Sequence, residues 1–350
     1  MKRTINFIIP ALIIMLVLGL GLGLGGCAVY PNNTKAMLEN CELEVYENKE
    51  SIYENEYTIE ETMFVADKPY PTYITINGES YCTSLTELFV HSHGLTNEDI
   101  KPLRYMTNLT SLTLATGSQG WEHWGHIHTE ITDISPLAEL TNLTHLELFG
   151  NYIADISPLV GLTNLTSLGL SLNRISDITP LAGLINLTNL TLAGNPISDL
   201  SALANLTNLE TLILHGFAIG ATLGLVPLEN NPDPFAGLTN TTFSLEPLAN
   251  LTNLRLLSLG SRQLNDSDII PLASLTSLRL LYMSNNQISD LTPLASLINI
   301  EALDVSDNQI SYITPLANLP NLRSLEVVAN HITDWSPVEH IAPVTGRPNP

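Results

Sequence analysis

Residues 140–161 read LTNLTHLELFGNYIADISPLVG, and residues 162–183 read LTNLTSLGLSLNRISDITPLAG. Further copies of this 22-residue phrase begin at Leu184, Leu206, Leu251, Leu275, Leu297 and Leu319, with weaker copies at Cys82 and Met106. A fixed period of this length predicts a solenoid, because each unit buries its apolar face only against its neighbours. The 45-residue spacing between Leu206 and Leu251 is best read as two repeats, one of them degenerate.

Each repeat has an internal pattern that predicts its local structure. The alternation in Leu146-x-Leu148 is typical of a short strand. Ser157-Pro158 predicts a hydroxyl N-cap followed by proline at the first position of a short helical turn. Asn151 recurs in most copies, where a buried amide would satisfy backbone groups. The inward positions are expected to be Leu143, Leu146, Leu148, Ile153, Ile156 and Leu159.

The repeats cover about residues 82–340 and resemble the leucine-rich repeats of the internalin and Sds22-like class of bacterial surface proteins. The segment TYITINGESYCTSLTEL resembles the capping β-hairpin of such arrays, with its turn at Asn77-Gly78. The resemblance implies an α/β solenoid, curved, with a parallel β-sheet on its concave side and short 3-10 or helical turns on its convex side. It also implies that the concave sheet binds another macromolecule.

The N-terminus has the features of a secretory signal, with Lys2 and Arg3 ahead of an apolar run. Leu24-Gly25-Gly26-Cys27 resembles the lipobox of bacterial lipoproteins, which implies cleavage before Cys27 and lipid attachment to it. The alternative is an uncleaved transmembrane helix. Either arrangement places the remaining chain on the extracytoplasmic face of the cell membrane.

The expected organisation has five parts. They are a lipoprotein signal peptide (1–26), a lipidated cysteine and acidic stalk (27–72), a cap hairpin with the first repeat (73–105), the leucine-rich repeats (106–340) and a C-terminal tail (341–350). The stalk is expected to be a solvated spacer, because glutamates dominate it.

Charge and motifs limit the function classes. The net charge is -22, from 35 acidic and 13 basic residues, which excludes a phosphate-neutralising nucleic-acid surface as the expected function. The chain carries no Walker A, Gly-x-Ser-x-Gly or His-Glu-x-x-His motif. We therefore expect a non-catalytic protein without a cofactor that binds a protein or peptide, with a glycan as the other partner class.

Two insertions interrupt the repeats, near residues 116–128 and 215–243. Both are expected at one edge of the solenoid, because each follows the end of a strand. Function often lies where a regular array is interrupted, and tryptophan is enriched in binding hot spots. The predicted partner site is centred on Trp121 and Trp124, together with the strand-end residues His91 and Phe149. Its other members are Ile213, His215 and Tyr282.

Three further hypotheses remain open on the sequence. His123, His126 and His128 form either a zinc site, which would make the chain a metal-binding lipoprotein, or part of an exposed recognition loop. Cys41 and Cys82 form either a disulfide or two separate thiols. Aspartates recur before the helical turns, where they suit helix N-termini, and the alternative is a calcium ladder.

Overall fold

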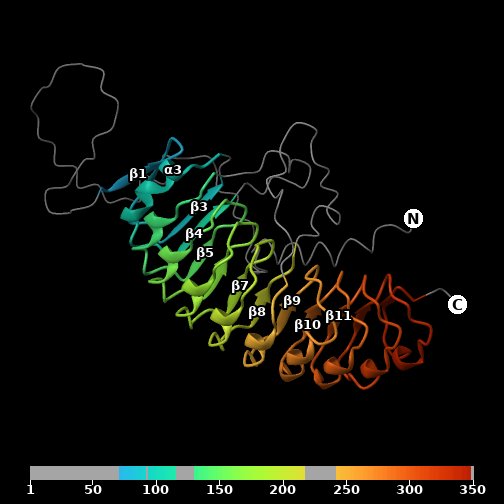
Figure 1. Ribbon diagram of the computed structural model, residues 1–350. Helices are drawn as coiled ribbons and strands as arrows, with labels where there is room; N and C mark the ends of the chain where they lie inside the picture. The colour runs from blue at the N-terminus through green and yellow to red at the C-terminus, as the bar shows by residue number, and fades with distance from the viewer. Residues whose placement is uncertain (1–70, 92–93, 116–129, 217–241, 348–350) are drawn as a thin grey trace, which may run out of the picture.

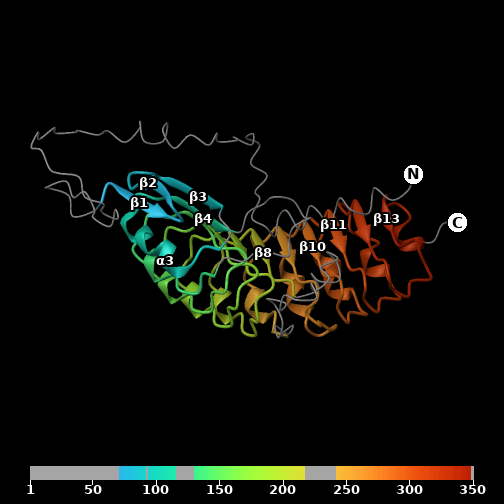
Figure 2. The same ribbon diagram turned by 90° about the horizontal axis from the view of Figure 1, so that it is seen from above.

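The computed structural model describes residues 71–91, 94–115, 130–216 and 242–347. These residues form a curved solenoid, with strands lining its inner side and short helical turns along its outer edge (Figure 1). One parallel sheet of 11 strands runs through the array, and its strands follow one another in chain order from β3 to β13 (Figure 2). The expected curved α/β leucine-rich-repeat solenoid is therefore confirmed.

The strands are short because each repeat gives only one segment to the sheet. They are β3 (Glu87–His91), β4 (Ser111–Ala115), β5 (His145–Glu147), β6 (Ser167–Gly169), β7 (Asn189–Thr191), β8 (Thr211–Ile213), β9 (Leu256–Ser258), β10 (Leu280–Tyr282), β11 (Ala302–Asp304), β12 (Ser324–Glu326) and β13 (Val344–Thr345). The last strand lies in the segment predicted as a tail.

The convex side of the described array carries short helical elements, two in succession between β3 and β4 and one between each later pair of strands from β4 to β13. These are α3 (Asn97–Ile100), η1 (Lys101–Tyr105), η3 (Ser135–Leu137), η4 (Ser157–Leu159), η5 (Thr179–Leu181), η6 (Ser201–Leu203), η7 (Glu246–Leu248), η8 (Ile270–Ser274), η9 (Thr292–Ser296), η10 (Thr314–Leu316) and η11 (Ser336–Val338). Among the described residues, no helix is long and apolar enough to span a bilayer.

The core lies between the sheet and these turns and is continuous along the array. The six inward positions predicted in the repeat at Leu140 are confirmed, since none of their side chains is more than 2% exposed. At the N-terminal end, β1 (Tyr73–Ile76) and β2 (Glu79–Cys82) form the predicted antiparallel hairpin. Its turn residues Asn77 and Gly78 both have positive φ, which the asparagine–glycine pair accommodates.

A buried asparagine ladder joins neighbouring repeats. The Asn173 side-chain nitrogen donates to the carbonyl oxygens of Leu148 and Leu170, at 2.9 and 3.0 Å. Its side-chain oxygen accepts a hydrogen bond from the amide of Ile153. The same arrangement recurs at Asn195, Asn286 and Asn308 and at the half-buried Asn330, and the side-chain nitrogen of Asn151 donates in the same way. The predicted role of this asparagine is therefore confirmed.

A second, exposed asparagine ladder runs along the array and was missed in the sequence. The Asn164 side chain donates to the carbonyl oxygen of Thr141 in the preceding repeat, at 2.9 Å. Equivalent bonds recur from Asn142, Asn186, Asn208, Asn253, Asn299 and Asn321. The Asn-Leu-Thr sequences at Asn142, Asn164 and Asn186 match the pattern of glycosylation acceptor sites, but their asparagines have a structural role in this ladder.

The predicted hydroxyl N-cap is wrong. The cap of the turn at Ser157 is Ile156, which makes no side-chain capping bond, and Ser157 is already helical. The Asp155 carboxylate accepts the hydrogen bond from the Ser157 amide instead, at 2.8 Å. This bond lowers the pKa of Asp155. The same bond to an amide at the start of a turn is made by Asp133, Asp177, Asp199, Asp290 and Asp334. These aspartates therefore satisfy free amides at helix N-termini, as one of the two hypotheses stated.

The reading of the 45-residue spacing as two repeats is also wrong. Strand β8 pairs directly with β9, and Thr211 lies opposite Leu256. No further strand fits between them in the sheet, so this stretch is one repeat that carries a long insertion. Strand pairing, not sequence spacing, fixes the register across the interruption.

Candidate functional site: the concave face

The concave face is built from side chains that point away from the core along each strand. One row follows the strand register from β5 to β12. It consists of Glu147, Gly169, Thr191, Ile213, Ser258, Tyr282, Asp304 and Glu326. The row is acidic at both ends and apolar in the middle. Neighbouring members lie one strand spacing apart, roughly 4.8 Å.

The middle of the face carries an apolar group that is separate from the solenoid core. We call it the concave apolar cluster, and it consists of Ala193, Ile213, Leu256, Leu280 and Tyr282. Ile213 and Tyr282, both predicted as partner-site residues, are brought together here. Their exposed fractions are 1% and 6%, although both belong to the outward row of the sheet.

An acidic pair follows the concave apolar cluster on the next two strands. Asp304 on β11 lies opposite Tyr282 on one side and Glu326 on the other. Burial and, after it, the negative charge of Asp304 raise the pKa of Glu326 and of the Tyr282 phenol. Burial is also the main cause that raises the pKa of Asp304. No ion pair among the described residues involves either carboxyl group.

A third acidic group lies on the other side of the cluster. The Glu147 carboxyl group accepts a hydrogen bond from the Phe149 amide at 3.1 Å. Burial raises the pKa of Glu147 to about 8, and this one hydrogen bond opposes the shift. Phe149, a predicted partner-site residue, is 7% exposed beside this carboxyl group.

Predicted residue His215 lies just beyond β8, next to the concave apolar cluster. Its Nδ1 is 3.3 Å from the hydroxyl of Ser258. Burial and, after it, the charge of Arg262 lower the pKa of His215 to about 4. The imidazole is therefore neutral at neutral pH and contributes a polar but uncharged contact.

Arg262 was missed in the sequence, although the repeat register offered a signal. It occupies the position that the buried asparagine ladder fills in other repeats, and its side chain is 1% exposed. Its guanidinium lies 5.0 Å from the centroid of the Phe243 ring. Burial lowers the pKa of Arg262 to about 10, so it stays charged at neutral pH.

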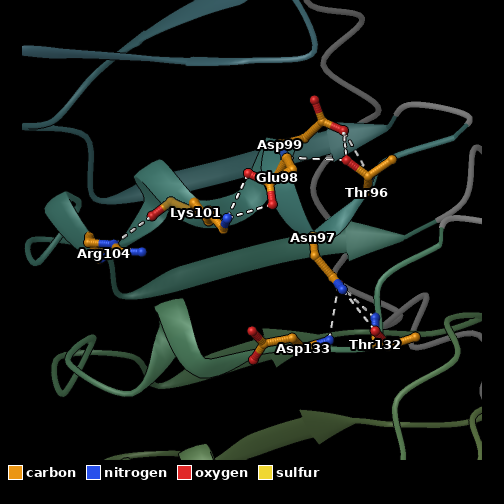
Figure 3. A network of polar contacts seen from close by, with 8 residues as sticks. All are labelled: Thr96, Asn97, Glu98, Asp99, Lys101, Arg104, Thr132 and Asp133. Atoms are coloured by element: carbon orange, nitrogen blue, oxygen red, sulfur yellow. Dashed lines mark hydrogen bonds and ion pairs between the residues drawn. The ribbon is translucent and has the colours of Figure 1, made fainter.

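The residues at both ends of the first insertion belong to the described structure. It follows β4, and the chain returns at Glu130, whose amide donates to the carbonyl oxygen of Leu95. Asn97 holds the next residues, because its side-chain oxygen accepts from the amides of Thr132 and Asp133 (Figure 3). His91 ends β3 on the neighbouring strand, opposite Ala115. Trp121 and Trp124 lie outside the described residues.

Of the predicted metal and thiol residues, the structure describes only Cys82. His123, His126 and His128 lie outside the described residues. Among the described residues, no group of three or more His, Cys, Asp or Glu could hold a metal. Cys27 and Cys41 also lie outside. Cys82 is disulfide-bonded, and its pairing with Cys41 stays a prediction.

Family models and solved structures agree with this architecture. The model for Leucine Rich repeats (2 copies) matches residues 141–183, 163–205 and 298–340, and the model for Leucine Rich Repeat matches residues 277–297. No curated protein sequence matches the chain.

Several solved structures of Listeria monocytogenes internalins are similar to this chain. An internalin (inlF) is 31% identical, with a TM-score of 0.57, over 75% of this chain and 73% of that one. Internalin C2 is 37% identical, with a TM-score of 0.49, over 59% of this chain and 80% of that one. The functional domain of InlJ shares the fold at 22% identity and a TM-score of 0.55, over 76% of this chain and 50% of that one. On its identity to inlF and its repeat architecture, the chain belongs to the internalin family of leucine-rich-repeat proteins.

Proposed function

We propose that this chain is a lipid-anchored, extracytoplasmic recognition protein that binds a protein partner through its concave face and insertion loops, without catalysis. The concave apolar cluster carries this proposal. The core between sheet and turns is complete without it, so Leu280 and Tyr282 have no packing role there. Aromatic and aliphatic side chains clustered amid polar groups are typical of binding hot spots.

The shape of the array supports a peptide or protein ligand. A curved solenoid presents a continuous surface that follows an extended segment of a partner. The Arabidopsis receptor kinase HAESA has the same fold, at 23% identity and a TM-score of 0.52, and its structure contains a peptide hormone. A glycan stays the second partner class for this chain, although the apolar centre of the face favours a protein.

The location rests on the N-terminal sequence. The lipobox-like segment ending at Cys27 would hold the protein on the outer face of the cytoplasmic membrane. The acidic residues 28–72 would then separate the repeats from the lipid surface. Internalin-family membership is consistent with a surface-exposed bacterial protein.

A matched pair of variants tests whether the concave face is the binding surface. The wild-type ectodomain, residues 28–350, would be used to capture partners from extracellular and envelope proteins. Leu280→Glu places a charge in the concave apolar cluster, whereas Ile298→Glu places the same charge outside the cluster, between η9 and β11, at a residue that is 53% exposed. We expect Leu280→Glu to lose the captured protein and Ile298→Glu to retain it, while both melt cooperatively. Equal capture by both variants would move the site away from the concave face.

A further inference from the structure

We propose that the concave face carries a subsite for the ammonium group of a lysine side chain, formed by Glu147, Ser171 and Thr191 around Gly169. The proposal rests on the proposed function, because it names the chemistry of the partner at one end of the same face. It follows from three acceptor groups on adjacent strands that have no cationic partner among the described residues.

The position of the Glu147 carboxyl group depends on Gly169. A β-carbon added to Gly169 would overlap the carboxyl carbon and both oxygens of Glu147. The carboxyl group therefore lies over β6, in the space that a side chain at residue 169 would fill. Glu147 as a whole residue is partly exposed, and it belongs to the outward row of the concave face.

Two hydroxyl groups lie near Gly169 in the strand register. Thr191 is directly opposite Gly169 on β7, and Ser171 is two residues beyond Gly169 on the same face. The exposed fractions of Ser171 and Thr191 are 0% and 7%. Neither hydroxyl has a hydrogen-bond partner within the described part of the chain. Buried polar groups are almost always paired, so two unpaired hydroxyls at this place indicate a missing hydrogen-bond partner.

A cation is the donor that fits the charge of this site. Glu147 is in none of the ion pairs formed by the described residues, and its one hydrogen bond comes from a neutral amide. Burial disfavours the ionised carboxylate, and a bound cation would restore it. A metal ion fits poorly, because no group of three or more His, Cys, Asp or Glu that could hold a metal occurs in the described residues.

Ammonium fits this set of acceptors better than guanidinium. A lysine ammonium group carries three N–H donors on one compact, tetrahedral nitrogen, a number that matches one carboxyl group and two hydroxyls. Arginine presents a planar fork that pairs best with two oxygens of one carboxylate.

A peptide array tests the proposal. The probes are heptapeptides with random flanks and a central lysine, norleucine, acetyl-lysine or arginine, and the bound species is the wild-type ectodomain. We expect at least fivefold greater retention on lysine-centred spots than on norleucine- or acetyl-lysine-centred spots, and less retention on arginine than on lysine. Equal retention on lysine and norleucine, or stronger retention on arginine, would overturn the proposal.

Variants separate this subsite from the general binding surface. Glu147→Gln and Gly169→Ala should both remove the preference for lysine while keeping retention on norleucine, because the concave apolar cluster is intact. Thr191→Val should reduce the preference, and Glu326→Gln, an acidic residue at the other end of the row, should leave it unchanged. A lysine preference that survives Glu147→Gln would overturn the assignment. Absence of retention on every spot would overturn the proposed peptide-binding function, and the subsite with it.

Discussion

The Nε of Arg262 donates a 2.5 Å hydrogen bond to the carbonyl oxygen of Leu214, a residue 48 positions earlier in the chain. In the regular repeats, a buried asparagine makes the corresponding bond to the preceding repeat. The second insertion separates the two residues in sequence, whereas the pairing of β8 with β9 brings them together. Arg262 thus continues the hydrogen bonding of the ladder across the interrupted repeat.

Replacing Arg262 should destabilise the array at this junction. Arg262→Ala removes the donors to the carbonyl oxygens of Leu214 and His215 and the contact with Phe243. We expect a loss of about 2 kcal/mol in the free energy of unfolding, measured by urea denaturation. Arg262→Asn should lose less, because asparagine makes this bond elsewhere. Arg255→Ala, at an exposed ion pair, should change stability by less than about 0.5 kcal/mol.

The two asparagine ladders should differ in their contribution to stability. Asn173→Ala leaves buried carbonyl oxygens of two repeats without a donor, so we expect a loss of about 2–3 kcal/mol. Asn164→Ala removes an exposed bond that water can replace, and the expected loss is about 0.5 kcal/mol. Thermal melting of the two variants beside wild type measures the difference. Equal losses would contradict the assignment of Asn173 as the more important contact.

The raised pKa of Glu147 predicts a pH-dependent stability. The folded protein holds a proton on this carboxyl group up to about pH 8, whereas the unfolded chain releases it near pH 4.5. The folded state therefore binds more protons in this window, and stability should fall as pH rises from about 4.5 to 8. Glu147→Gln should remove this part of the fall and be more stable than wild type at pH 8, by on the order of 2 kcal/mol.

Chemical denaturation at pH 5, 6.5 and 8 measures the Glu147 effect. The control is Glu139→Gln, an exposed residue at which the same substitution should change stability by less than about 0.5 kcal/mol. A stability difference between wild type and Glu147→Gln that stays constant from pH 5 to 8 would contradict the buried, protonated carboxyl group.

The proposed lipid anchor predicts a processing defect. Cys27→Ala removes the thiol that would carry the lipid, so the variant should accumulate as an unprocessed precursor and incorporate no labelled palmitate. Metabolic labelling and mobility on a denaturing gel measure both effects. Cys41→Ala is the matched control and should be processed and labelled as wild type is. Labelling that persists in Cys27→Ala would exclude the lipoprotein assignment.

The first insertion should contribute to binding and little to folding. Replacing residues 117–128 by a short regular loop leaves the contacts of Leu95 and Asn97 with residues 130–133 in place. The variant should therefore melt like wild type. It should bind the captured partner more weakly by at least about 2 kcal/mol, if Trp121 and Trp124 are hot spots. Full affinity in a normally melting variant would place the site on the bare sheet or the second insertion.

The sequence by itself determined the repeat, its inward residues and the class of fold. These follow from local periodicity, because residues such as Leu146 and Leu148 must face the core in every copy, and a short turn needs an amide acceptor such as Asp155. The outward row was also readable from the register. The burial and protonation of the residues in that row could not be predicted from the sequence, because packing in the core does not restrict which side chains occur there.

Only the tertiary structure decided which outward residues meet. Ile213 and Leu256 lie in one cluster, although a long insertion separates them in sequence, because β8 pairs directly with β9. The spacing of the repeats had wrongly suggested a further repeat between these strands. The position of the Glu147 carboxyl group over Gly169 depends on two neighbouring strands at once. Burial then changes the protonation of Glu147 and His215, and burial is a property of the packed array that no single repeat contains.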